Sequence, residues 1–129
     1  MSHASAGAAF ERRIRKILEA EGYHVSRSAA SLGPYDLDAS KPGQRLFVQA
    51  KCTGRGLDGI PKIDPVEWNA LYDLAVHLGA IPIAVCRPAP RRPPVFWRMT
   101  GRKSGQRGQR SPLVRFELDE VAAALEGAA

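Results

Sequence analysis

The segment 46–85 constrains the fold more than any other part of the chain, because it contains a strand, a helix and a second strand in close succession. Apolar side chains occupy every second position of residues 46–52, which is the period of a β-strand. Residues 64–79 carry the signals for both the start and the end of a helix. The apolar run 81–85 is typical of a buried strand, although Pro82 restricts its pairing. The segment therefore predicts a sheet with a helix packed against it.

The helix expected over residues 64–79 has the clearest boundaries in the sequence. Asp64 is expected as the N-cap, and Pro65 is a residue type favoured at the first helical position. Glu67 follows Asp64 by three residues and completes a capping box. Gly79 is expected to end the helix, because glycine is favoured just past the last helical turn.

The remaining elements complete a small mixed α/β domain. A helix is expected over residues 5–21, with Ser5 as its N-cap, because apolar residues recur there at helical spacing. The other expected elements are strands at 23–26, 35–39, 95–99 and 114–118, a turn at 41–43 and a closing helix at 119–125. This order predicts a single domain over residues 1–129, with a central β-sheet flanked by helices.

Length and composition fit one globular domain that crosses no membrane. The chain has 129 residues, of which 44% are hydrophobic and 25% are charged, and such a chain can bury a core without a metal or a disulfide. No apolar stretch approaches the ~20 residues that span a bilayer, and no secretory signal is visible. Cys52 and Cys86 each stand alone in an apolar run, so both are expected as reduced, buried residues of a cytoplasmic protein.

Positive charge is concentrated in the second half of the sequence. Residues 74–116 contain nine Lys and Arg residues and no Asp or Glu, and eight of the nine are Arg. Because Arg pairs with phosphate through two parallel hydrogen bonds, this segment favours a nucleic acid as partner. Within it, residues 101–112 are rich in Gly, Gln, Ser and Arg and have no apolar anchor, so a flexible basic loop is expected there.

Polar residues on neighbouring strands form a candidate metal site. Gln49 and Lys51 lie two apart in the alternating strand and therefore point to the same side. Asp36 and Asp38 lie two apart in the preceding strand, so pairing of the two strands brings an acidic residue alongside. With Glu11 on the packed first helix, these residues supply the oxygen ligands that Mg²⁺ prefers. The lysine would orient or deprotonate a water near the metal.

The same residues resemble a known family in their order and spacing. Glu11 lies in GAAFERRIRKILEAEGYHV, Ser31 and Asp36 lie in SRSAASLGPYDL, and Lys51 ends LFVQAK. These motifs resemble the PD-(D/E)xK nuclease superfamily, and most of all the archaeal-type Holliday junction resolvases. The resemblance covers residues 7–87. It implies a restriction-endonuclease-like fold and a dimeric, Mg²⁺-dependent nuclease, with Mn²⁺ able to substitute, that makes paired nicks in four-way DNA junctions.

The resemblance also implies roles for individual residues. Lys51 would position the attacking water, Glu11 would hold that water, and Ser31 would lie near the scissile phosphate. The expected catalytic residues are Glu11, Ser31, Asp36, Gln49 and Lys51. The expected metal ligands are Glu11, Asp36, Gln49 and the backbone carbonyl of Ala50. The residues expected to bind DNA, from charge and resemblance together, are Arg12, Arg27, Arg55, Arg91, Arg92, Arg102, Lys103, Arg107 and Arg110.

Two departures from the family pattern leave alternatives open. Gln49 stands where the motif has Glu, which removes a negative charge and predicts weaker metal binding, although the Mrr-like restriction endonucleases also have Gln-x-Lys. One residue separates Pro34 from Asp36, whereas the family more often has Pro directly before Asp, so Asp38 is a rival ligand. Asp36 is preferred because Leu37 follows it, as an apolar residue follows the family's aspartate.

Three functions are compatible with these features. The leading interpretation is a structure-selective DNA endonuclease that resolves four-way junctions by metal-dependent phosphodiester hydrolysis as a homodimer. The first alternative is a restriction-like (Mrr-like) or general DNA nuclease, which would prefer linear duplex. The second alternative, of another class, is a non-catalytic DNA-binding module on a decayed nuclease fold, which Gln49 and the basic segment motivate.

Overall fold

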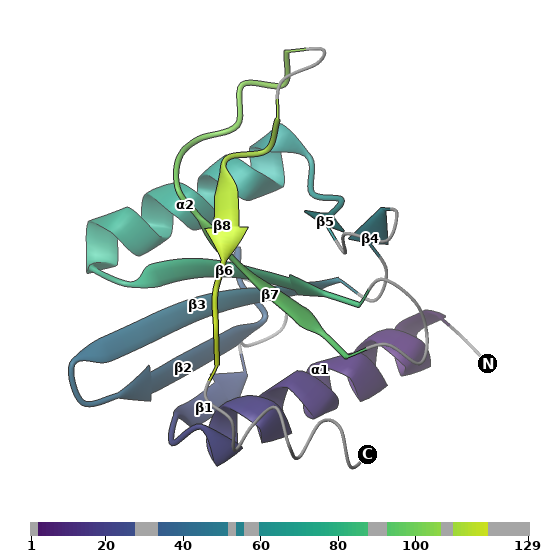
Figure 1. Cartoon of the computed structure of the whole chain (residues 1–129), viewed down its shortest axis with the longest axis vertical. Coiled ribbons are helices and arrows are strands. Elements are labelled where there is room, and N and C mark those ends of the chain that lie inside the picture. Colours follow the sequence, from purple (N-terminus) through teal and green to yellow (C-terminus); the bar gives the residue numbers. More distant parts are fainter. Residues whose placement is uncertain are drawn as a thin grey trace.

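The computed structural model describes residues 3–27, 34–51, 54–55, 60–87, 93–106 and 110–118. The elements, in chain order, are α1 (His3–Ala20), β1 (His24–Arg27), β2 (Leu37–Lys41), β3 (Gln44–Lys51), β4 (Gly54–Arg55), β5 (Ile60–Pro61), α2 (Pro65–Leu78), β6 (Ile81–Cys86), β7 (Val95–Met99) and β8 (Leu113–Arg115). Six strands form one sheet in the order β1-β2-β3-β6-β7-β8, and β4 pairs with β5 beside it (Figure 1). The expected mixed α/β domain with a central sheet is confirmed.

The sheet is mixed because one central pair of strands is parallel. Strand β3 runs parallel to β6, and α2 connects the two, whereas the other described pairs are antiparallel. Pro82 lies in β6 opposite Phe47 of β3, but the pairing of β6 with β7 begins only at Ile83. The residue without an N–H group therefore lies outside the ladder to β7, and a proline is tolerated near the centre of the sheet.

The two helices cover opposite faces of the sheet, each over its own hydrophobic cluster (Figure 1). Apolar residues of α1 pack against Leu46 and Val48 of β3. Apolar residues of α2 pack against Phe47, which points to the other face. The alternation of β3 places Gln49 and Lys51 on the α2 side of the sheet, whereas Ala50 packs on the α1 side. This division determines which helix can reach each residue of the candidate site.

Several predicted boundaries differ from those in the structure. Helix α1 begins at His3, so Ser5 lies inside the helix and is not its N-cap. Strand β2 begins at Leu37, and Asp36 therefore precedes the strand. The turn between β2 and β3 was predicted correctly: Lys41 pairs with Gln44, and Gly43 has φ 79°, a conformation that favours glycine. The closing helix expected at 119–125 lies outside the described residues.

Helix α2 has the caps that the sequence predicts, with one difference. The Asp64 carboxylate accepts a hydrogen bond from the Glu67 N–H at 2.9 Å, and Gly79 ends the helix in the left-handed conformation. The Glu67 side chain was expected to complete the capping box by turning back to the N-cap. Instead, its carboxylate lies 3.4 Å from the Lys51 ammonium on β3. Only half of the box is formed, and the Glu67 carboxylate faces the end of β3.

The segment 101–106, part of the expected flexible loop, is held against α2. The Trp68 indole N–H donates to the carbonyl of Gly101 at 2.9 Å. The Asn69 side chain donates to the Lys103 carbonyl and accepts from the Lys103 N–H, at 2.9 and 2.7 Å. Arg102 pairs with Asp73 on the same helix. Three of these polar contacts involve the backbone of the segment, and the fourth joins two side chains. The sequence did not reveal them, because the segment has no apolar residues from which packing could be predicted.

Substituting Asn69 with Ala should therefore lower the free energy of unfolding by ~1–3 kcal/mol, because two hydrogen bonds to the Lys103 backbone are lost together. Chemical denaturation followed by tryptophan fluorescence measures the change. Gln106→Ala, at an exposed position of the same segment, is the control and should have little effect. Equal stability of the two variants would contradict the anchoring role of Asn69.

Cys86 is a buried, reduced residue of β6, as expected. Burial raises the pKa of its thiol to about 11, so the thiol is neutral near pH 7. Cys52 lies outside the described residues. In the part of the chain that the structure describes, no helix has the length and apolar character needed to cross a membrane.

Candidate active site

Asp36 is held at the end of strand β3 by the β3 backbone. Its N–H donates to the Val48 carbonyl at 2.8 Å, and its carboxylate oxygen Oδ2 accepts a hydrogen bond from the Ala50 N–H at 2.8 Å. Within the described residues, no donor reaches the second oxygen, Oδ1. Asp36 is thus fixed beside Gln49 and Ala50 by two backbone contacts, with one carboxylate oxygen that no donor in the described ranges occupies.

Asp38, the rival ligand, has a different environment. Both of its carboxylate oxygens accept hydrogen bonds from Arg45, at 3.2 Å from Nε and 2.7 Å from Nη2. Arg45 lies on the neighbouring strand β3, and its guanidinium also stacks over the Phe47 ring. Because two parallel hydrogen bonds to Arg satisfy a carboxylate well, the geometry favours Asp36 over Asp38 as the residue available to a metal.

Gln49 and Lys51 lie near the C-terminal end of β3, on the face of the sheet that α2 covers. Gln49 pairs in register with Ala84, and Lys51 with Cys86, on the parallel strand β6. The Lys51 side chain is 30% exposed, and its ammonium forms an ion pair with Glu67 of α2. A carboxylate of α2, the helix that covers this face of the sheet, therefore holds Lys51 at the end of β3.

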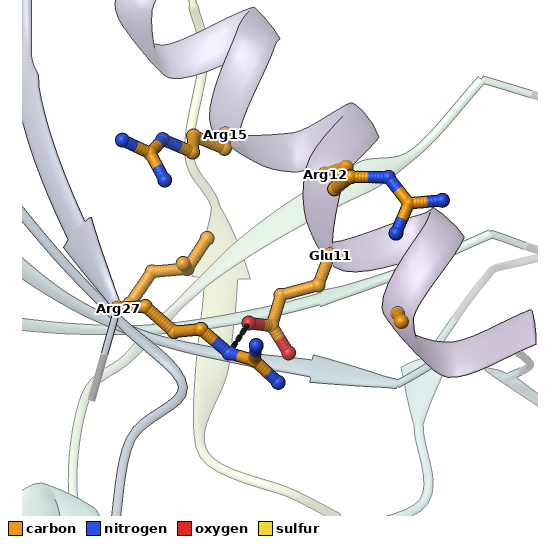
Figure 2. Close-up of a pocket in the computed structure, with 6 residues that line it drawn as sticks. Glu11, Arg12, Arg15 and Arg27 are labelled. Carbon is orange, nitrogen blue, oxygen red and sulfur yellow. Dashed lines mark ion pairs between the residues drawn. The ribbon is translucent and has the colours of Figure 1, made fainter. Parts of the chain in front are cut away.

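Glu11 approaches the site from the opposite helix. Its carboxylate lies 2.9 Å from Nε of Arg27, the last residue of β1, and its side chain is only 18% exposed. Figure 2 shows Glu11 extending from α1 toward Arg27, with Arg12 and Arg15 on the same helix. These four residues, with Ala8 and Leu37, line a pocket of about 220 Å³. A pocket with three arginines and one carboxylate suits an anionic group.

The charges of the site act on one another. Burial raises the pKa of Asp36, and the Glu67 charge adds to this, whereas the Ala50 N–H, Lys51 and Arg27 oppose it. Burial also raises the pKa of Glu11; the Asp36 charge raises it further, and Arg27 lowers it. The charge of Asp36 thus disfavours ionisation of Glu11, and a bound divalent cation would relieve this effect.

Replacing Arg27 with Gln should raise the pKa of Glu11 further, because the variant removes the charge and the hydrogen bond that favour the ionised carboxylate. The acid limb of any reaction that needs ionised Glu11 would then move to higher pH. Carboxyl ¹³C NMR titration of the Glu11 side chain measures the shift. Arg15→Gln is the control, since Arg15 lines the same pocket but pairs with Glu19. Identical titrations in Arg27→Gln and the wild type would contradict the assigned pairing.

The donors at this site fit Mg²⁺ by their chemistry. Asp36 offers a carboxylate oxygen, Gln49 an amide oxygen and Ala50 a backbone carbonyl, all of them hard ligands. No three His, Cys, Asp or Glu side chains among the described residues converge as a metal-ligand group. Mg²⁺ does not require such a group, because it is commonly bound through one or two carboxylates, with waters and substrate phosphate completing its octahedron.

The structure places the other residues expected at the site in different surroundings, and some of them lie outside the described ranges. Ser31, Arg91, Arg92 and Arg107 lie outside the described residues, and Arg55 is described only by its backbone in β4. Arg12 lines the pocket, and Arg110 is exposed. Lys103 faces inward, because its ammonium donates to the Ile63 carbonyl at 2.8 Å and lies over the Trp68 ring. Lys103 and Arg102 thus each have a partner within the protein, and DNA binding by these two residues stays a prediction.

Two residues near the site were not expected there. Arg15 follows Glu11 by one helical turn, so the spacing of helix positions could have placed it in the pocket. Glu67 was interpreted as part of a helix cap, and only the tertiary fold brings it to Lys51.

Comparison with known proteins identifies the family of this chain. A family model described as archaeal Holliday junction resolvase matches residues 2–100, a range that contains Glu11, Asp36, Gln49 and Lys51. The chain belongs to the archaeal Holliday junction resolvase family. The resemblance found in the sequence is therefore confirmed.

Individual members of the family are similar over different spans. A crossover junction endodeoxyribonuclease Hjc from Methanocaldococcus jannaschii is 41% identical over 49 residues, which are 38% of this chain and 36% of the relative. The matched segment thus spans about a third of that relative's length. The solved structure of Archaeoglobus fulgidus Hjc, a Holliday junction resolvase, has a TM-score of 0.62 at 21% identity, over 92% of this chain and 88% of that one. This likeness confirms the fold.

Proposed function

We propose that this chain is an endodeoxyribonuclease that requires Mg²⁺, or Mn²⁺ in its place, and resolves four-way DNA junctions by paired nicks. The observation that carries the proposal is the position of Asp36, fixed by the Ala50 N–H at the end of β3 and within electrostatic reach of Glu11 and Lys51. Membership of the resolvase family supplies the substrate class.

The reaction is the hydrolysis of a phosphodiester. A water oxygen attacks phosphorus, the bond to the leaving oxygen breaks, and the proton of the water ends on the leaving oxygen or in solvent. Mg²⁺, when bound, supplies positive charge that stabilises the phosphorane-like transition state and lowers the pKa of water. Asp36, Gln49 and the Ala50 carbonyl would hold it. Lys51 orients the attacking water and offers positive charge to the phosphate, and Glu11 holds the same water from the α1 side.

The arginine-lined pocket next to the site can bind the phosphate backbone of DNA. Arg12, Arg15 and Arg27 surround a space next to Glu11, so a phosphate that neighbours the scissile one would bind there. Contacts to phosphate position a nucleic acid without reading its sequence, and each contact adds to the salt dependence of binding. This arrangement favours recognition of junction shape over base sequence.

A homodimer follows from the geometry of the substrate. One chain offers one such site, whereas resolution of a four-way junction requires two strands to be cut symmetrically. A twofold dimer places two identical sites on a symmetric junction. Analytical ultracentrifugation with and without junction tests this part of the proposal, since a protein that stays monomeric in both conditions excludes it.

The deciding experiment is cleavage of a labelled, immobile four-way junction beside a linear duplex of matched sequence, with Mg²⁺, Mn²⁺ or EDTA. Symmetric nicks near the branch point that require a metal and exceed duplex cutting are the expected result. Preferential cutting of the duplex would favour the restriction-like nuclease. Binding without cutting in either metal would favour the non-catalytic module, the function that the neutral Gln49 motivates.

A further inference from the structure

Glu67 takes part in the N-cap of α2 through its backbone and not through its carboxylate. The N-cap contact is made by the Glu67 backbone N–H to Asp64, and this contact does not need the Glu67 side chain. The side chain is 51% exposed and extends to the Lys51 ammonium at 3.4 Å. A first-turn glutamate is therefore aimed at the end of β3.

The neutral residue of the candidate motif faces the same side of the sheet as this carboxylate. Gln49 and Lys51 project to the α2 face of β3, together with Phe47, and Glu67 belongs to the first turn of α2. The position that would carry a carboxylate beside Lys51 is occupied by an amide. Glu67 brings a carboxylate to that lysine from the facing helix, 16 positions later in the chain.

The charge of Glu67 also reaches the central aspartate. Among the described residues that influence Asp36, Lys51 and Glu67 act with opposite signs from the α2 side, while Arg27 acts from the α1 side. Asp36 is bonded to the Ala50 N–H, one residue before Lys51, so the Lys51–Glu67 ion pair forms at the same end of β3. Without Glu67, Lys51 would lose its carboxylate partner, and the motif itself would offer only the positive charge of Lys51 and the neutral Gln49.

We propose that Glu67 takes over the charge of the motif carboxylate that Gln49 lacks, and that it is a positioning residue that holds Lys51 beside Asp36. The inference rests on the proposed nuclease function, because it assigns Glu67 to that same site. It explains how Gln-x-Lys can work in this chain: the negative charge that favours a divalent cation is kept, but it comes from the helix and not from the strand. Glu67 acts through Lys51 and through charge.

The test compares Glu67→Gln with a matched control, Asp73→Asn. Both changes convert an acid to its amide on α2, both remove one negative charge, and the two side chains are equally exposed, at 51% and 52%. Each acid also pairs with one basic side chain. Binding of the junction in EDTA should respond equally to the two changes. Single-turnover cleavage should fall by about 10–100-fold in Glu67→Gln, the range for loss of a partner that orients a metal site, and stay near the wild-type rate in Asp73→Asn.

A second variant separates the proposed role from general damage to the helix. The double variant Gln49→Glu with Glu67→Gln returns the carboxylate to the strand, so its cleavage rate should recover most of what Glu67→Gln loses. Calorimetric titration of the metal-free proteins with Mn²⁺ gives a readout that needs no cleavage. Affinity should fall in Glu67→Gln, recover in the double variant and remain unchanged in Asp73→Asn.

These measurements keep the two proposals distinguishable. If the wild type cuts junctions and Glu67→Gln matches Asp73→Asn in both rate and Mn²⁺ affinity, the role of Glu67 is overturned and the nuclease function stands. If the double variant recovers neither quantity, the role is overturned too. If the wild type cuts nothing with any metal, the function fails, and the Mn²⁺ affinities alone decide the role of Glu67.

Discussion

Replacing Asp36 with Asn should lower the rate of junction cleavage by about 10²–10⁴-fold, the range for loss of a group that acts directly on the reacting atoms. The amide keeps the size of the side chain and can still accept the hydrogen bond from the Ala50 N–H. It removes the negative charge that a divalent cation needs, and its NH₂ group cannot serve as a ligand. The loss is therefore expected in the cleavage step, and junction binding in EDTA should persist or become slightly tighter.

Asp38→Asn is the control for this prediction, because Asp38 lies two residues further on and has the same chemistry. Its carboxylate is occupied by Arg45, and the variant should lose only a partly exposed ion pair, worth ~0.2–1 kcal/mol of stability. Cleavage by Asp38→Asn should remain near the wild-type rate. A large loss in Asp38→Asn with little loss in Asp36→Asn would reverse the assignment of the two aspartates.

The parts of the fold that the sequence predicted well are those governed by local chemistry. Helix α2 begins after Asp64 and ends at Gly79, because the N-cap acceptor and the left-handed C-cap are properties of single residues. The hairpin between β2 and β3 follows from the turn at Gly43, and its register brings Asp36 alongside Val48 and Ala50. The central contact of the site was thus accessible to prediction, because a tight hairpin fixes which residues face each other.

The features that the sequence did not predict depend on tertiary contacts between polar side chains. Glu67 contacts Lys51 because α2, which connects β3 to β6, packs on the sheet with its first turn next to the end of β3. The segment 101–106 is fixed by Asn69, which pairs with backbone groups 34 positions away and leaves no periodic pattern. Local propensity carries no information on such pairs. Both sets of contacts join elements that are far apart in the sequence.

Lys51→Met should reduce the cleavage rate by about 10²–10⁴-fold as well, although for a different reason. Methionine keeps much of the aliphatic length of lysine but removes the ammonium that orients water and offsets charge at the scissile phosphate. The loss also leaves Glu67 without its ion pair and removes a positive charge that lowers the pKa of Asp36. The pKa of Asp36 should therefore rise, and the remaining activity should be confined to higher pH than in the wild type.

Lys41→Met separates this effect from a general loss of positive charge. Lys41 is 29% exposed against 30% for Lys51, and it also pairs with one glutamate, Glu21, at 3.9 Å. It lies in β2 at the far end of the β2–β3 hairpin, opposite Gln44, so its charge is remote from Asp36. Both variants should weaken junction binding slightly and to the same extent, because each removes one cation. At saturating protein, only Lys51→Met should show the large loss of cleavage. An equal decline in both variants would mean that Lys51 contributes only to the general attraction of DNA.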